Sequence, residues 1–281
     1  MESVETMDHS IVVPYDFTPV AMNAVAHSVI LASRLKVGIT LLHIIGKESE
    51  EETKKKAMEE EVQKILVQWN VTPNYLIRAG SIFKTINKVA NELSATLIVM
   101  GTHGLKGIQK ITGSRALKVI VGSRIPFLVI QDAPKPNLQY KNLVFPVDFK
   151  TENKEKLRWV EFMHEHFDSK TFLLTNTSKA IGEIENRTRA NLAFSKTFLE
   201  ERRIDYELVV IDKEKSLSDG TIEFTLERDA DLIIIMTTRD ISFHDYIIGA
   251  QEQYMIANSA KLPVMVINPR TDLIKYGYKN F

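Results

Sequence analysis

Apolar residues along this chain fall into short runs that are separated by longer amphipathic segments. The runs at 10–14 and 38–45 are rich in β-branched residues, which is typical of buried strands. Between them, Thr18 and Pro19 favour a helix start, because a hydroxyl caps the first amides and proline suits the first helical position. This pattern predicts a strand, a helix that ends near Leu35, and a second strand.

The same alternation continues to the end of the chain. Strands that are almost wholly apolar and alternate with helices predict a parallel sheet covered on both faces. Right-handed crossovers make such a sheet doubly wound, a Rossmann-like α/β fold. The remaining predicted strands are 72–78, 96–100, 127–131, 142–146, 170–176, 205–211, 232–236 and 264–268, and the remaining predicted helices are 50–69, 80–93, one from about Ser114, 151–166, 180–202, 218–228 and 252–259.

The second half of the chain repeats the first. The matching segments are VVPYDF (12–17) with VFPVDF (144–149), LIVM (97–100) with IIIM (233–236), and IPFLVI (125–130) with LPVMVI (262–267). A domain-sized period indicates duplication rather than a solenoid. The two prolines within 132–137 mark a short, stiff linker. We therefore expect two tandem doubly wound domains, over 1–134 and 140–281.

Charge and composition exclude several classes of protein. The chain has 36 basic and 36 acidic residues and no cysteine. Balanced charge gives no reason to expect a nucleic-acid or anionic-membrane partner, and a chain without cysteine has no disulfide or thiolate metal site. The first ten residues lack a signal-peptide pattern, and no apolar run reaches the roughly 20 residues that span a bilayer. We expect a cytoplasmic protein.

A glycine-bearing loop follows the strand at 96–100. Its glycines are Gly101, Gly104, Gly107 and Gly113, and Ser114 follows at the start of a predicted helix. Glycine lets the backbone approach a ligand closely, and free amides at a helix start favour phosphate. The alternative is that the glycines only shape a surface loop and Ser114 only caps the helix. Spacing alone leaves both interpretations open.

Asp16 is a second candidate, because it follows the first strand and should lie at the same edge of the sheet as the glycine loop. A carboxylate there accepts hydrogen bonds from the amino or hydroxyl groups of a nucleoside. The alternative is a loop aspartate that binds nearby amides before the Thr18 cap. The sequence alone favours neither of these two roles for Asp16.

These segments resemble the universal stress protein family, most closely over 9–132 and more weakly over 140–269. The resemblance rests on VVPYDFTP (12–19), LLHI (41–44), VMGTHG (99–104), Gly113-Ser114 and IPFLV (125–129). It implies a five-stranded parallel sheet in each half, and ATP binding in some members through Gly-x-x-Gly, nine residues, and Gly-Ser or Gly-Thr. The candidate nucleotide-binding residues that it implies are Pro14, Tyr15, Asp16, Ile44, Met100, Gly101, His103, Gly104, Gly113, Ser114 and Arg115.

The chain departs from this pattern in both halves. Eight residues separate Gly104 from Gly113, one fewer than in the family pattern, which puts the phosphate geometry in doubt. In the second half, Thr237, Asp240 and Ala250 stand at the positions aligned with the two glycines and the serine. We therefore expect ATP in the N-terminal domain only.

Two other functions remain alternatives. One is a scaffold or interaction protein without nucleotide, built as a pseudo-dimer whose halves pair through their last strands, and able to form a homodimer. The other is an enzyme such as a slow ATPase. The sequence shows no catalytic pair, activated nucleophile or set of metal ligands, so we expect no catalytic residue and no metal.

Overall fold

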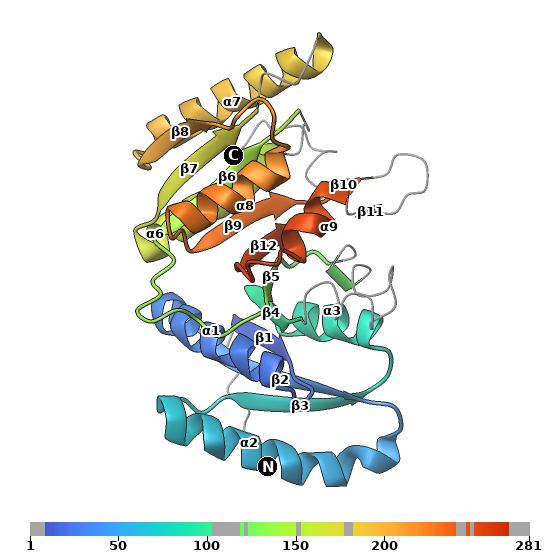
Figure 1. The fold of residues 1–281 in the computed structure, drawn as a ribbon. Coiled ribbons are helices and arrows are strands. Elements are labelled where there is room, and N and C mark those ends of the chain that lie inside the picture. Colours follow the sequence, from blue (N-terminus) through green and yellow to red (C-terminus); the bar gives the residue numbers. More distant parts are fainter. Residues whose placement is uncertain are drawn as a thin grey trace. The chain divides into compact units, whose positions relative to one another are not determined.

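The computed structural model describes residues 9–102, 119–120, 123–149, 153–176, 182–239, 246–247 and 250–269. The chain divides into two compact units, Met1–Leu138 and Gln139–Phe281. Each unit is an α/β fold with a parallel sheet and helices on both faces (Figure 1). The predicted fold class is thus confirmed.

The strands of the N-terminal unit lie in the order β3-β2-β1-β4-β5, and all neighbours pair in parallel. The order reverses between β1 and β4, which makes the sheet doubly wound. The elements are β1 Ser10–Pro14, α1 Pro19–Leu35, β2 Gly38–Ile45, η1 Glu48–Glu50, α2 Glu51–Trp69, β3 Asn74–Ala79, α3 Ile82–Glu92, β4 Leu97–Gly101 and β5 Phe127–Ile130.

The C-terminal unit repeats this order as β12-β9-β6-β7-β8, also in parallel. Its reversal lies between β6 and β9. The elements are β6 Asn142–Val147, α6 Asn153–Phe167, β7 Lys170–Thr175, α7 Glu183–Glu201, β8 Tyr206–Val210, α8 Leu217–Glu227, β9 Leu232–Met236, β10 Thr238–Arg239, β11 Tyr246–Ile247, α9 Ala250–Ile256 and β12 Val264–Ile267.

Helix α1 begins as the sequence predicts. The side chain of Thr18 accepts a hydrogen bond from the amide of Ala21 at 3.3 Å, and proline occupies the first turn. The helix ends at Lys36, whose left-handed backbone (φ 56°) lets its amide donate to the carbonyl of Ala32. This termination turns the chain directly into β2.

The core of each unit is formed by its most apolar strands, which include the last strand of the chain order in each unit. The residues of β9 and β12 are all buried, as are those of β5 and nearly all of β1 and β6. Burial on both faces explains why these strands are apolar throughout rather than alternating.

The structure adds short elements that the sequence pattern does not predict, the 3-10 helix η1 and two strands. Strands β10 and β11 form a short antiparallel pair, with Thr238 opposite Ile247 and Arg239 opposite Tyr246. Strands of two residues are too short to show any hydrophobic period, so the pattern predicted only a loop there. Elsewhere the predicted ends differ by a few residues, the usual uncertainty for helix and strand ends.

Candidate functional site

The candidate site of the N-terminal unit lies at the point where the strand order reverses. Strands β1 and β4 are neighbours, with Ile11 paired to Leu97 and Val12 to Ile98. Their carboxyl ends therefore lie side by side, and the segments that follow Pro14 and Gly101 leave the same edge of the sheet. In doubly wound sheets this is the edge where ligands bind.

Tyr15 anchors the end of β1 to helix α2. Its amide donates to the carbonyl of Leu42 at 2.9 Å, and its hydroxyl donates to the carboxylate of Glu61. Burial, and then the hydrogen bond and charge of Glu61, raise the pKa of Tyr15 far above its ordinary value. Tyr15 is a neutral donor at physiological pH, and its hydroxyl is committed to Glu61.

Asp16 is exposed and organises the turn into α1. Its carboxylate accepts hydrogen bonds from the amide of Thr18 at 3.1 Å and from the hydroxyl of Thr18 at 2.5 Å. These two bonds are the local contacts expected if Asp16 is a loop aspartate that binds nearby groups before the Thr18 cap. A carboxylate has about four acceptor positions, so Asp16 retains acceptor capacity for a ligand.

An aromatic cluster lies behind Asp16. The ring of His43 is 4.8 Å from that of Phe17, which in turn is 5.5 Å from that of Tyr15, both in edge-to-face geometry. Nδ1 of His43 is 2.8 Å from the carbonyl oxygen of Tyr15. His43 thus packs against an aromatic ring and lies within hydrogen-bond distance of a carbonyl near the end of β2. The next residue, Ile44, is half-buried at the same edge.

Gly101 ends β4 against the first turn of α1. A Cβ atom at this position would lie 2.3 Å from the carbonyl oxygen of Val20 and 2.7 Å from its carbonyl carbon. Such contacts with backbone are prohibitive, so helix packing alone requires glycine here. Met100, one residue earlier, is half-buried. An approach of Gly101 to a ribose, which the resemblance implies, stays a prediction.

The structure therefore brings six of the predicted residues together at this edge: Pro14, Tyr15, Asp16, Ile44, Met100 and Gly101. The other five, His103, Gly104, Gly113, Ser114 and Arg115, lie outside the described residues.

The hydrogen-bond registers correct the alignment of the two halves by one residue. Val12 pairs with Ile98, and its counterpart Val144 pairs with Ile233. Gly101 therefore corresponds to Met236, not Thr237. The shared methionine made LIVM and IIIM look equivalent, but apolar strands look alike when shifted by one position. The second half still lacks both glycines.

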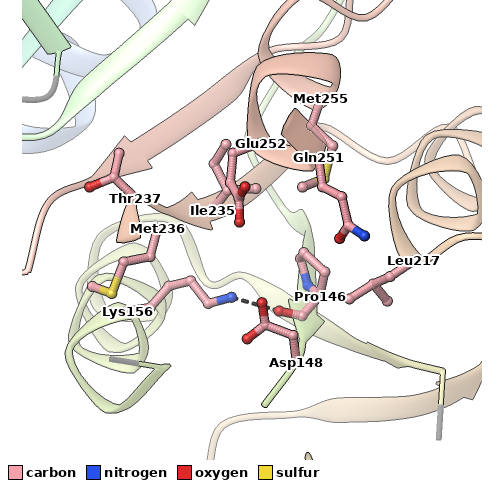
Figure 2. A pocket seen from close by; sticks show the side chains of 10 residues that line it. All are labelled: Pro146, Asp148, Lys156, Leu217, Ile235, Met236, Thr237, Gln251, Glu252 and Met255. Atoms are coloured by element: carbon pink, nitrogen blue, oxygen red, sulfur yellow. Dashed lines mark hydrogen bonds between the residues drawn. The ribbon is translucent and has the colours of Figure 1, made fainter. Parts of the chain in front are cut away.

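The equivalent edge of the C-terminal unit holds a small pocket with a charged lining (Figure 2). Its cavity volume is about 20 Å³, and one water molecule needs roughly 10–15 Å³. Asp148 belongs to the repeated segment VFPVDF (144–149), whereas no sequence pattern described above singled out Lys156 or Glu252. The lining residues are Pro146, Asp148, Lys156, Leu217, Ile235, Met236, Thr237, Gln251, Glu252 and Met255.

A signal for Lys156 was present in the sequence. Within the repeat it occupies the position of Ala24, which lies on the buried face of α1. A charged residue at a buried helix position is informative, because lysine is almost never buried unless it is paired.

Two further features concern only the part of the chain that the structure describes. Within it, no group of three histidine or acidic side chains is placed to hold a metal ion. No helix of that part is both long and apolar enough to cross a membrane.

Comparison with known proteins agrees with this fold. The model of the universal stress protein family matches residues 7–131. A universal stress protein of Methanocaldococcus jannaschii is 26% identical over 152 residues, which cover 47% of this chain and 86% of that protein.

Two solved structures cover both units. A universal stress protein from Archaeoglobus fulgidus has a TM-score of 0.74 at 17% identity, covering 94% of this chain and 99% of that chain. A putative universal stress protein from Pseudomonas aeruginosa has a TM-score of 0.64 at 16% identity, covering 94% of each. Residues 7–131 therefore belong to the universal stress protein family, in a chain whose two halves share that family's fold.

Proposed function

We propose that the N-terminal unit binds an adenine nucleotide, with ATP as the candidate ligand, and that the chain acts as a regulatory or stress-response protein rather than an enzyme. The observation that carries this proposal is the meeting of Asp16, Ile44 and Gly101 at the reversal of strand order. The glycine-bearing segment with Gly113 and Ser114 follows directly from that edge in the sequence.

The chemistry of the described residues supports a nucleoside at this edge. Asp16 offers unused acceptor positions to ribose hydroxyls or a base amino group. Ile44 and Met100 are half-buried and supply apolar surface for a base. Ligand pockets commonly combine such an apolar lining with a few polar groups.

Calorimetric titration of the full chain with ATP and with AMP tests the proposal. We expect binding to the wild-type protein and a loss of at least about tenfold in Gly113→Val, because a side chain there blocks the approach of phosphate to backbone amides. The matched control is Gly249→Val, the glycine before Ala250 that the sequence repeat aligns with Gly113, and this variant should bind as the wild type does. Absence of binding at millimolar nucleotide, or equal binding by both variants, would refute the proposal.

A second candidate function is that of a scaffold whose halves pair through their last strands. The observation that favours it is that β5 and β12 each end the strand order of their own unit. An unpaired edge strand exposes amides and carbonyls that invite pairing.

Hydrogen exchange tests this second candidate. Every second amide of Phe127–Ile130 and Val264–Ile267 points away from the strand's partner in its own unit. We expect these amides to be protected if the last strands pair. Rapid exchange of both sets would exclude the arrangement.

Balanced charge further leads us to propose a protein without nucleic-acid or membrane partners. We also propose that the protein is cytoplasmic.

A further inference from the structure

The most unusual side chain of the C-terminal unit is a buried lysine. Lys156 lies on α6 with a relative exposure of 3%. Its ammonium donates a hydrogen bond to the carbonyl of Pro146 at 2.6 Å and lies 4.0 Å from the centroid of the Phe145 ring. Removing an ammonium from water is costly, so such a group persists only where the surroundings compensate.

The surroundings of this ammonium are the carboxyl ends of the two central strands. Pro146 and Asp148 come from the end of β6, and Ile235 and Met236 come from the end of β9. Glu252, on α9, is also buried and lines the same pocket. Figure 2 shows the lysine side chain reaching into this space. The ammonium thus sits where the fold usually receives a ligand.

The comparison of the two halves shows how this space arises. At the same edge of the N-terminal unit, the helix and strand carry Ala24 and Gly101, and the backbone of β4 touches α1. In the C-terminal unit these two positions carry Lys156 and Met236. Two small residues are replaced together by two long ones, and both long side chains line the pocket.

We infer that the ammonium of Lys156 is a built-in occupant of the C-terminal crevice, which it fills in place of a diffusible ligand. A phosphate group brought to this crevice would meet Asp148 and Glu252 and a cavity of about 20 Å³. A primary ammonium ion suits the crevice once the lysine is removed, because the carbonyl of Pro146 and the carboxylates of Asp148 and Glu252 line it. This inference is independent of nucleotide binding in the N-terminal unit.

Chemical rescue of Lys156→Ala tests the inference in the full chain. A Trp69→Phe background leaves Trp159 as the only tryptophan, so its fluorescence reports thermal unfolding of the C-terminal unit. We expect Lys156→Ala to lower the midpoint by several degrees and n-propylammonium, which matches the three carbons and the ammonium that are deleted, to restore a large part of the loss. Tetramethylammonium at equal concentration should restore none, because it cannot donate to the carbonyl of Pro146.

Two further variants make the result decisive. Lys213→Ala removes an exposed lysine of the same unit and should neither lower the midpoint nor respond to amines. Lys156→Met keeps the stem but removes the charge, and it should be destabilised without being rescued, because its own side chain fills the space. A methionine variant as stable as the wild type, or equal effects of the two ammonium ions on Lys156→Ala, would overturn the inference. If the alanine variant does not fold, the unfolding midpoint of Lys156→Met relative to the wild type tests the inference.

Discussion

At the scale of single residues, Gly101 shows that one position can satisfy two different explanations. The sequence singled it out as the first glycine of a ligand-binding loop. The structure gives a sufficient packing reason, because α1 passes directly over it. A ligand is therefore not needed to explain this glycine, and Gly113 is the better position for testing nucleotide binding.

Substitution of Gly101 should destabilise the N-terminal unit. In Gly101→Ala the new methyl would lie 2.3 Å from a backbone oxygen, and such overpacking typically costs about 1–3 kcal/mol. Urea unfolding followed through Trp69, in a Trp159→Phe background, measures this loss. Gly46→Ala is the control, since its methyl meets only the Glu50 side chain at 3.6 Å and should change the free energy of unfolding little. Equal stability of the two variants would contradict the packing account.

His27 makes the stability of the N-terminal unit depend on pH. Its side chain is buried, with Nε2 3.3 Å from the carbonyl oxygen of Asp132, and burial lowers its pKa from 6.5 to about 4. The unfolded chain therefore binds the proton more tightly than the folded one. Stability from this group is complete above pH 6.5 and is lost as the pH falls towards 4.

This loss should amount to roughly 3 kcal/mol between pH 7 and pH 4, at about 1.4 kcal/mol per pKa unit. Urea midpoints of the wild type and of His27→Gln over that range provide the measurement. We expect the variant to show a distinctly weaker dependence on pH. Parallel curves would mean that other groups dominate the acid response.

At the scale of elements, the sequence predicted nearly every described helix and strand. The spacing of apolar residues and the residues typical of helix starts indicated the same elements. Thr18 and Pro19 mark the start of α1, and apolar runs mark the central strands. Because these strands are apolar throughout, the sequence did not reveal that the alignment of β4 with β9 is shifted by one residue. Only pairing with a neighbouring strand reveals a register, and pairing is a long-range property.

The packing of α8 on the sheet edge depends on a second tight glycine. Gly220 is the fourth residue of α8, and a Cβ atom there would be 2.3 Å from Cγ2 of Ile211. Helix propensity alone predicts that Gly220→Ala stabilises the helix by about 1 kcal/mol. We expect the opposite sign, a loss of about 1–3 kcal/mol, because the steric cost exceeds the gain in propensity.

A double-mutant cycle separates these two effects. Ile211→Ala removes the atoms that the new methyl would meet, so Gly220→Ala should cost little or become favourable in that background. Urea unfolding followed through Trp159 gives the four free energies. A stabilised single variant Gly220→Ala would show that Ile211 moves aside easily.

At the scale of the whole molecule, the two halves share one fold but differ in the residues at the carboxyl ends of their central strands. The repeat, the linker region and the loss of glycines in the second half were all readable from the sequence. The buried lysine was not predicted, although the repeat aligns it with Ala24; the fold was needed to show that α6 turns Lys156 towards the strand ends. Contacts made by a single side chain across elements are the least predictable part of the site.

This difference between the halves predicts the stoichiometry of nucleotide binding. Calorimetry with ATP should give about one site per chain, because the C-terminal crevice is small and lined by Asp148 and Glu252. Lys156→Ala should leave this number unchanged, since the two carboxylates remain. Two sites per chain in the wild-type protein would contradict our account of the C-terminal unit.

The contact between Gly101 and the first turn of α1 also bears on the entropy of binding. The carbonyl of Val20 packs closely against the end of β4, so we expect this side of the N-terminal edge to be ordered before any ligand arrives. A preorganised wall does not have to lose freedom when a ligand binds, and that lowers the entropic cost of association. Whatever ligand this edge receives, the ordering that accompanies its binding should fall on segments other than α1 and β4.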